Sequence, residues 1–280
     1  MKPIIDFLKK QPLLTTVIGV SFVILSIRFL GPRMTSDLEA GVLRLAFAFS
    51  GMCFLLLISG SKAFDRSSGT TGYVCKTLWP TLIISVFGFV AAIAGEIIKG
   101  TPLRSDCVLG VLIIAFEFLA VGLVEEVTAR GLINDGLLYQ FRDRKNIFFI
   151  IALVDVIVFG AAHIIGSKID TPMAFAQALM KTLSAGVGAL AYLFLYWKTR
   201  NLWGIAIMHG ALDFIASIPE ALFRQGAKDT AASYVSADAK TALAAVAVLG
   251  VDLIINIIIV IWIWKKHMKD VDFEEIRRTW

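Results

Sequence analysis

The sequence predicts an all-α protein: a polytopic membrane helix bundle of about eight transmembrane helices, with both termini cytoplasmic. The composition is the first observation behind this prediction. Hydrophobic residues make up 58% of the 280 residues, the mean hydropathy is +0.78, and only 18% of the residues are charged. In a soluble domain of this size the fraction of charged residues is nearer a quarter. The apolar residues also form long runs, which a bilayer requires and a soluble core does not.

Eight apolar runs are long enough to cross a bilayer. Each offers about 20 residues, which at about 1.5 Å per residue matches a hydrocarbon core of roughly 30 Å. A backbone in lipid must satisfy its own hydrogen bonds, so these runs are expected to be helices. The first run follows three lysines, but it is long and has no small-x-small cleavage site, which indicates an uncleaved helix. The runs lie roughly at 12–30, 41–60, 78–98, 107–133, 146–166, 173–197, 202–223 and 242–264.

The distribution of Lys and Arg gives the orientation. With the termini inside, sixteen of the 27 basic residues fall in inner segments, seven in outer loops and four within spans. The positive-inside rule therefore predicts cytoplasmic termini. We expect one integral membrane domain over residues 1–280, in a prokaryotic plasma membrane, with the longest loop (roughly 224–241) on the outside.

The same composition excludes several other classes of protein. The net charge is +5, but the basic residues are scattered over short loops, so no nucleic-acid surface is predicted. Cys53, Cys75 and Cys107 are isolated and lack C-x-x-C spacing, so neither a disulfide framework nor a zinc ribbon is expected.

Charged residues within the apolar runs concentrate in the second half of the chain. A charge near the bilayer centre costs roughly 2.5–3.5 kcal/mol on insertion scales, so such residues normally face the protein interior and are paired. The fourth run contains Glu117, Glu125, Glu126 and Arg130, the fifth contains Asp155, Phe159 and His163, and the seventh contains His209 and Asp213.

Helical spacing groups some of these residues. Glu126 and Arg130 are four residues apart, so they share a face and can form an ion pair. Glu125 lies about 100° around the helix and is free to face a neighbour. His209 and Asp213 are likewise one turn apart.

The other intramembrane charges, and the third histidine, have simpler interpretations. Interhelical pairs or snorkelling helix ends are expected for Glu96, Arg44, Lys181, Asp252, Asp155 and Glu117. His267 lies in the basic C-terminal tail and is expected to be solvated.

Three ordered motifs carry a family resemblance. They are E-E-x-x-x-R at Glu125, Glu126 and Arg130, F-x-x-x-H ending at His163, and H-x-x-x-D at His209 and Asp213. Together they resemble the signature motifs of the CPBP family, which comprises type II CAAX prenyl proteases and bacteriocin-processing or abortive-infection-type intramembrane proteases. The resemblance covers the core helices, about residues 107–216.

The resemblance implies an intramembrane endopeptidase and a role for each motif residue. Glu125 and His163 would activate the attacking water, and Glu126 with Arg130 would support the site. His209 and the residue at 213 would stabilise the oxyanion. Family members often have Asn at this last position. Asp213 cannot donate a hydrogen bond unless it is protonated, so we expect it to orient His209, whose N–H becomes the oxyanion donor.

A metal mechanism is the alternative for the same residues. Glu125, His163 and His209 with an open fourth position would suit a catalytic zinc. The chain lacks H-E-x-x-H and G-x-S-x-G motifs. Metal-free catalysis without a cofactor is therefore favoured, and zinc stays open.

A single site requires residues from different depths to converge. Vertical spans would put Glu125 nearer the cytoplasmic side and His163 nearer the outer side. Convergence is expected if the fourth helix continues towards Phe141, or if the fifth is tilted or broken near Gly160.

The expected partners are the lipid bilayer and a membrane-associated peptide or protein substrate. A prenylated C-terminus, a bacteriocin or signalling-peptide leader and another membrane segment are the candidates. Two other functions stay open. One is a proton- or ion-coupled transporter that uses the buried groups as a relay, although no inverted repeat is apparent. The other is a non-catalytic immunity or scaffold protein of the same fold.

Overall fold

The fold was analysed in a computed structural model, which describes residues 2–64, 71–223 and 239–280. Within these ranges the chain is helical and contains no strand. The predicted outer loop at 224–241 lies almost wholly outside the described residues. The main helices are α1 (Lys2–Lys9), α2 (Pro12–Leu30), α3 (Asp37–Ile58), α4 (Thr71–Thr77), α5 (Trp79–Lys99), α6 (Cys107–Glu126), α7 (Gly136–Phe141), α8 (Ile147–Ala162), α9 (Pro172–Thr199), α10 (Leu202–Phe223), α11 (Ala239–His267) and α12 (Phe273–Thr279). Short 3₁₀ segments η1 (Gly31–Arg33) and η2 (Gly60–Phe64) follow α2 and α3, and the π-helix η3 (Val127–Asp135) joins α6 to α7.

The predicted membrane bundle is confirmed, with one correction to its spans. Seven helical segments of the described chain are long and apolar enough to cross a membrane. The predicted fifth span, 146–166, is wrong at its C-terminal end, because α8 has only 16 residues and stops at Ala162. At about 1.5 Å per residue it reaches about 24 Å, short of a hydrocarbon core of roughly 30 Å.

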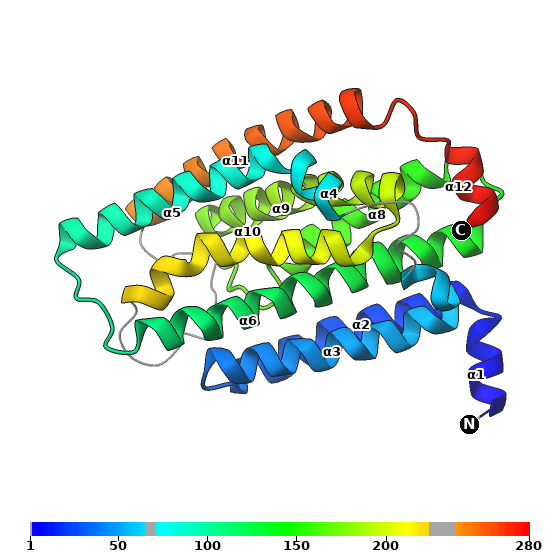
Figure 1. Cartoon of the computed structure of the whole chain (residues 1–280), viewed down its shortest axis with the longest axis horizontal. Helices are drawn as coiled ribbons and strands as arrows, with labels where there is room; N and C mark the ends of the chain where they lie inside the picture. Colours follow the sequence, from blue (N-terminus) through cyan, green and yellow to red (C-terminus); the bar gives the residue numbers. More distant parts are fainter. Residues whose placement is uncertain (1, 65–70, 224–238) are drawn as a thin grey trace.

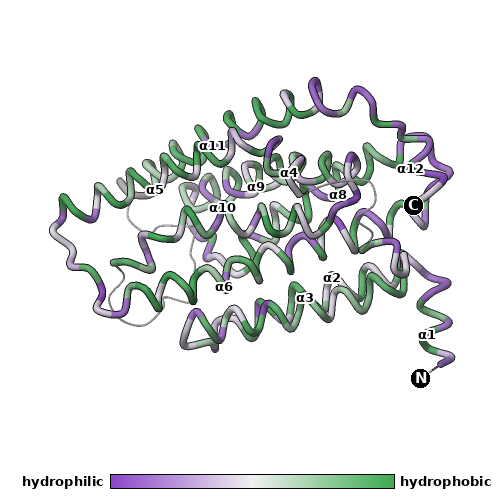
Figure 2. Tube along the Cα trace, viewed as in Figure 1, coloured by the Kyte–Doolittle hydropathy of each residue, from purple (hydrophilic) through white to green (hydrophobic). Residues whose placement is uncertain are grey.

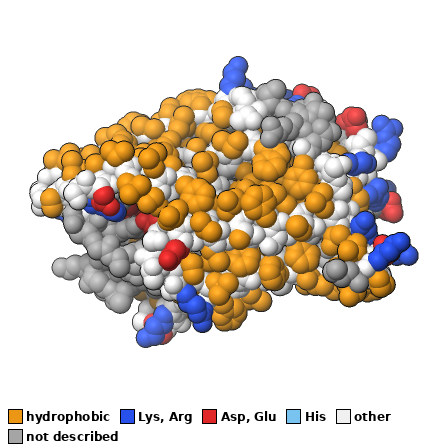
Figure 3. Space-filling model, turned by 60° about the horizontal axis from the view of Figure 1, so that its bottom comes forward, with side chains coloured by type: hydrophobic (Ala, Val, Ile, Leu, Met, Phe, Trp, Pro, Cys, Tyr) orange, Lys and Arg blue, Asp and Glu red, His pale blue; other side chains and the backbone are white. Residues whose placement is uncertain are grey.

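The helices run back and forth along one long axis, and both termini lie at the same end of the bundle (Figure 1). Hydropathy along the trace is highest in the helix bodies and lowest near α12 and the connections (Figure 2). On one face, hydrophobic side chains cover most of the middle while Lys and Arg lie mainly towards the ends (Figure 3). Large side chains such as Phe87 (71% exposed) and Val108 (74% exposed) are therefore placed to meet lipid.

The fourth span is a single long rod with a change of winding in its middle. α6, η3 and α7 follow one another without a break from Cys107 to Phe141, over 35 residues. This confirms the expected continuation of the fourth helix towards Phe141. Glu125 consequently lies near the centre of the rod rather than near its end.

Two glycines allow α10 to approach α6 closely. A Cβ atom on Gly122 would lie 2.3 Å from the carbonyl oxygen of Ala206, and one on Gly210 would lie 2.5 Å from that of Phe118. Small residues at such crossings let helix backbones meet in membranes. Because Gly210 directly follows His209, this contact brings His209 beside the end of α6.

Two ion pairs involve polar residues outside the motifs, one between helices and one within α5. Arg44 of α3 lies 2.5 Å from Glu117 of α6, and Lys99 lies 2.8 Å from Glu96. The three cysteines are free. The expectation that His267 is solvated is wrong: its Nδ1 lies 2.9 Å from the Tyr73 hydroxyl, and its ring packs on Trp262.

Candidate functional site

The site begins with an ion pair buried at the junction of α6 and η3. Arg130 Nε lies 3.1 Å from Glu126 Oε2, and both side chains are 0% exposed. Residues 127–135 are wound as a π-helix, a form that often marks functional sites. The predicted i,i+4 pair therefore forms even though the winding changes between its two members.

Arg130 also connects this rod to α8 and α9. Its Nη2 donates to the Ala189 carbonyl oxygen and lies 3.8 Å from Asp155 Oδ2. The guanidinium lies over the rings of Phe159 and Tyr192, 5.0 and 5.5 Å from their centroids. Such ring contacts favour a cation that has been removed from water. Arg130 is therefore held in one position by groups from three helical elements.

The other oxygen of Glu126 holds His209 of α10. His209 Nδ1 lies 2.6 Å from Glu126 Oε1, which makes the Nδ1–H the donor to a carboxylate. The ring stacks on Tyr192, with centroids 4.8 Å apart and an interplanar angle of 20°. Its Nε2 lies 3.6 Å from Glu125 Oε2 and 3.5 Å from Asp213 Oδ2. His209 thus bridges the buried pair and two partly exposed carboxylates.

His163 follows the last residue of α8, where the chain turns back before α9. Its Nδ1 lies 2.8 Å from the Phe159 carbonyl oxygen. A carbonyl oxygen only accepts, so Nδ1 carries a proton, and in the neutral tautomer with this proton the lone pair is on Nε2. The rings of Phe159 and His163 are 4.9 Å apart. Because α8 is short, His163 reaches the middle of the bundle rather than its far end.

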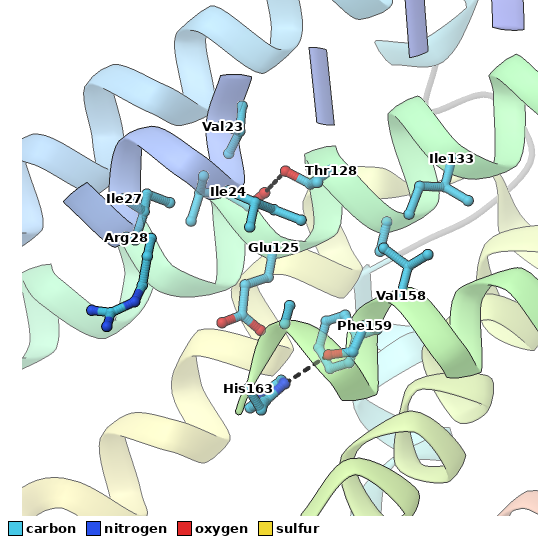
Figure 4. A pocket seen from close by; sticks show the side chains of 13 residues that line it. Val23, Ile24, Ile27, Arg28, Glu125, Thr128, Ile133, Val158, Phe159 and His163 are labelled. Carbon is cyan, nitrogen blue, oxygen red and sulfur yellow. Dashed lines mark hydrogen bonds between the residues drawn. The ribbon is translucent and has the colours of Figure 1, made fainter. Parts of the chain in front are cut away.

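Glu125 and His163 line the same cavity, which has a volume of about 240 Å³. The cavity lies between α2 and α8, over the α6–η3 junction (Figure 4). In that view the Glu125 carboxylate and the His163 ring lie close to Phe159. The remaining wall is largely apolar, formed by Val23, Ile24, Ile27, Val124, Ala129, Ile133, Val158, Phe159 and Ala162, together with Thr128 and Arg28.

The structure brings the six predicted site residues into one region. Glu126, Arg130 and His209 form its buried side, while the Glu125 and Asp213 side chains are 31% and 40% exposed. The short contact to His209 comes from Glu126, and Asp213 faces the same nitrogen as Glu125.

Sequence reasoning missed two side chains of this region, Tyr192 and Arg28, and gave a third, Asp155, no place in the site. Asp155 was expected only as a pairing residue, although Asp155, Phe159 and His163 follow one another at intervals of four along one face of α8. That spacing was a usable signal. Tyr192 and Arg28 belong to none of the motifs; the only sequence signal for Arg28 was its position within an apolar run, and Tyr192 had none.

The residues considered for a metal do not form a compact ligand cluster. Within the described ranges, no group of three or more His, Cys, Asp or Glu side chains has the spacing to hold a metal ion. The chemistry of the donors, a glutamate and two imidazoles, still suits zinc. Metal dependence is therefore left to experiment.

Comparisons with known proteins give one match. Residues 108–215 match the family model described as type II CAAX prenyl endopeptidase, Rce1-like. The matched segment starts in α6 and ends in α10, and it contains all six predicted site residues. Neither the comparison with curated proteins nor that with solved structures found a match.

Proposed function

We propose that the chain hydrolyses a peptide bond in a membrane-associated peptide or protein by means of Glu125 and His163, because residues 108–215 match the family model of Rce1-like type II CAAX prenyl endopeptidases. The family supports a CAAX-type intramembrane protease in general, and the helices make the chain a multi-pass membrane protein. A prenylated C-terminus and a signal- or bacteriocin-type peptide are the proposed substrates, and a prokaryotic plasma membrane is the proposed location.

The observation that carries this proposal is the shared cavity of Glu125 and His163. One residue comes from the middle of the long α6–η3–α7 rod, and the other from the end of the short helix α8. A carboxylate and an imidazole at one cavity can together hold a water molecule and remove its proton.

The proposed reaction begins with a water molecule between Glu125 and the Nε2 atom of His163. Glu125 accepts a proton from the water as the water oxygen attacks the carbonyl carbon of the peptide bond. The electron pair of the C=O bond moves onto the carbonyl oxygen. The electron pair on the oxyanion then re-forms the C=O bond as the C–N bond breaks, and the proton on Glu125 passes to the leaving nitrogen. The products are a carboxylic acid and an amine, and Glu125 returns to its starting form.

We propose His209 as the donor to the oxyanion. Its Nδ1–H is directed to Glu126, so donation to an oxyanion falls to Nε2, which carries a proton only in the imidazolium form. Glu126, Glu125 and Asp213 surround this ring and supply the counter-charge. In this assignment Glu126 and Tyr192 fix the imidazole, and Asp213 is an ionic partner of Nε2.

We propose a supporting role for Arg130. Glu125 and Glu126 are adjacent in sequence, and two ionised carboxylates side by side repel each other. Arg130 neutralises Glu126 through the 3.1 Å pair. The negative charge of Glu126 is thereby matched, which reduces its repulsion of the Glu125 carboxylate.

The proposal is tested with purified protein in detergent or vesicles, against a panel of membrane-tethered and prenylated peptides. Glu125→Gln and His163→Ala should each lose cleavage by about 10²- to 10⁴-fold, the usual contribution of a general base. Glu96→Gln is the matched control, because Glu96 pairs with Lys99 on α5 and lines no part of the cavity. Its rate should equal that of the wild type.

Two outcomes decide between the alternatives. Cleavage that persists in Glu125→Gln would refute the assignment of proteolysis to this site. Loss of wild-type cleavage on chelation, with recovery on adding zinc, would replace the metal-free mechanism by a zinc mechanism using Glu125, His163 and His209.

A further inference from the structure

The cavity contains a cation that belongs to none of the motifs. Arg28 of α2 lies within the first membrane span, outside the segment that matches the family. Its side chain is exposed, yet it lines the same cavity as Glu125 and His163. A charge in a membrane span is expensive unless it has a partner or a function.

The fold reserves space for the guanidinium of Arg28. Gly166, in the turn after His163, has a φ of +83°, a conformation that favours glycine. A Cβ atom on Gly166 would lie 1.7 Å from Arg28 Nη2 and 2.0 Å from its Cζ. The guanidinium therefore rests against the backbone of the segment that carries His163, and a side chain at position 166 would displace it.

The rest of the cavity wall defines the chemistry of an occupant. Apart from Arg28, its polar lining consists of Glu125, Thr128 and His163, and all other lining side chains are apolar. Arg28 and Val158 lie towards opposite edges of the cavity, with Glu125 between them (Figure 4). A molecule that is bound in the cavity and extends past Glu125 would therefore contact apolar side chains on one side and the Arg28 guanidinium on the other.

We propose that Arg28 determines specificity by binding the C-terminal carboxylate of the peptide whose bond lies at Glu125. This inference rests on the proposed function of the site. A guanidinium binds a carboxylate through two parallel hydrogen bonds, and such charge-assisted bonds are stronger than bonds between neutral groups. A lipid phosphate has similar chemistry. Arg28 is assigned to the peptide because it lies in the cavity that contains Glu125.

The test compares two membrane-tethered reporter peptides that differ only at the C-terminus, one a free acid and the other an amide. Both are assayed in vesicles of neutral phosphatidylcholine. Wild-type protein should prefer the acid by about 10- to 100-fold in kcat/KM, the range expected for hydrogen bonds to a charged group. The preference should appear mainly in KM, because the carboxylate is bound equally before and during the reaction.

Arg28→Gln should abolish this preference, with acid and amide cleaved at similar rates. Gly166→Ala should reduce it as well, because the added methyl group displaces the guanidinium while the charge stays. Arg33→Gln is the matched control, since Arg33 is an exposed arginine five residues further on and does not line the cavity. It should keep the wild-type preference.

Three results would contradict parts of this account. Arg28→Gln with an unchanged acid preference overturns the role of Arg28. An Arg28→Gln defect that affects acid and amide equally, and only in vesicles with anionic lipid, also overturns it and assigns Arg28 to a lipid phosphate. Absence of any Glu125-dependent cleavage of either peptide overturns the proposed function itself.

Discussion

Replacing Arg130 with leucine tests whether the buried ion pair holds the site together. The Arg130 and Glu126 side chains are 0% exposed, and the Asp155 side chain is 1% exposed. Leucine would remove the guanidinium that the buried Glu126 and Asp155 carboxylates share. Breaking a buried pair by removing one partner costs about 3–5 kcal/mol. We expect the free energy of unfolding of Arg130→Leu, measured by equilibrium denaturation in detergent micelles, to fall by that amount.

A double-mutant cycle with Glu126→Gln isolates the pair itself. In the Arg130→Leu background, Glu126→Gln removes one of the stranded charges, so the double variant should be less destabilised than the sum of the single variants. Groups in contact couple by about 0.5–3 kcal/mol. Lys99→Leu is the control, because the Lys99 side chain is 68% exposed in its pair and should change stability by less than about 1 kcal/mol. Additive single effects would refute the direct Glu126–Arg130 interaction.

Two further substitutions test how the site is positioned. Gly210→Ala puts a Cβ atom 2.5 Å from the Phe118 carbonyl oxygen, so it should destabilise the protein by about 1–3 kcal/mol and lower the rate of peptide cleavage. Gly250→Ala is the control, because its Cβ atom would meet nothing within 4 Å, and it should change neither stability nor cleavage. Equal effects of the two substitutions would contradict the close α6–α10 contact. Tyr192→Phe keeps the ring stacked on His209 and should cleave at nearly the wild-type rate. Tyr192→Ala should lower the cleavage rate about 3- to 10-fold, which corresponds to the energy of one aromatic pair. A Tyr192→Ala protein that cleaves as fast as the wild type would show that the stack does not position His209.

The helices were largely predictable from the sequence because lipid enforces a simple rule. A run of about 20 apolar residues in a bilayer has to be a helix. The rule fails at the end of α8, where Ile164 and Ile165 continue the apolar run beyond the helix. There His163 N and Ile164 N bond to the carbonyl oxygens of Gly160 and Ala161, so a turn replaces the helix. Hydropathy cannot distinguish an apolar helix from an apolar turn.

The site was predictable to the extent that its residues follow short-range spacing. The i,i+4 rule identified the Glu126–Arg130 pair and the His209–Asp213 contact, and both contacts are present in the structure. The link between Glu126 and His209 spans 83 positions, and it depends on how α6 and α10 cross. Local spacing carries no information about such a crossing.

The same limit explains why Tyr192 and Arg28 were missed. Tyr192 joins the site by stacking on His209 from α9, and Arg28 joins it across the cavity from α2. In the sequence Tyr192 is one more aromatic residue of an apolar run, and Arg28 resembles a basic residue that ends a span. The packing of the helices gives both residues their place.

The central claim, that Glu125 activates a water molecule for peptide hydrolysis, is tested most directly by cleavage in ¹⁸O-labelled water. Purified wild-type protein should release a product whose new carboxyl terminus contains one ¹⁸O atom, detected by mass spectrometry. Glu125→Gln, with its fold checked by circular dichroism, should release this product about 10²- to 10⁴-fold more slowly. Product formation by Glu125→Gln at the wild-type rate, or a wild-type product without ¹⁸O, would contradict the account.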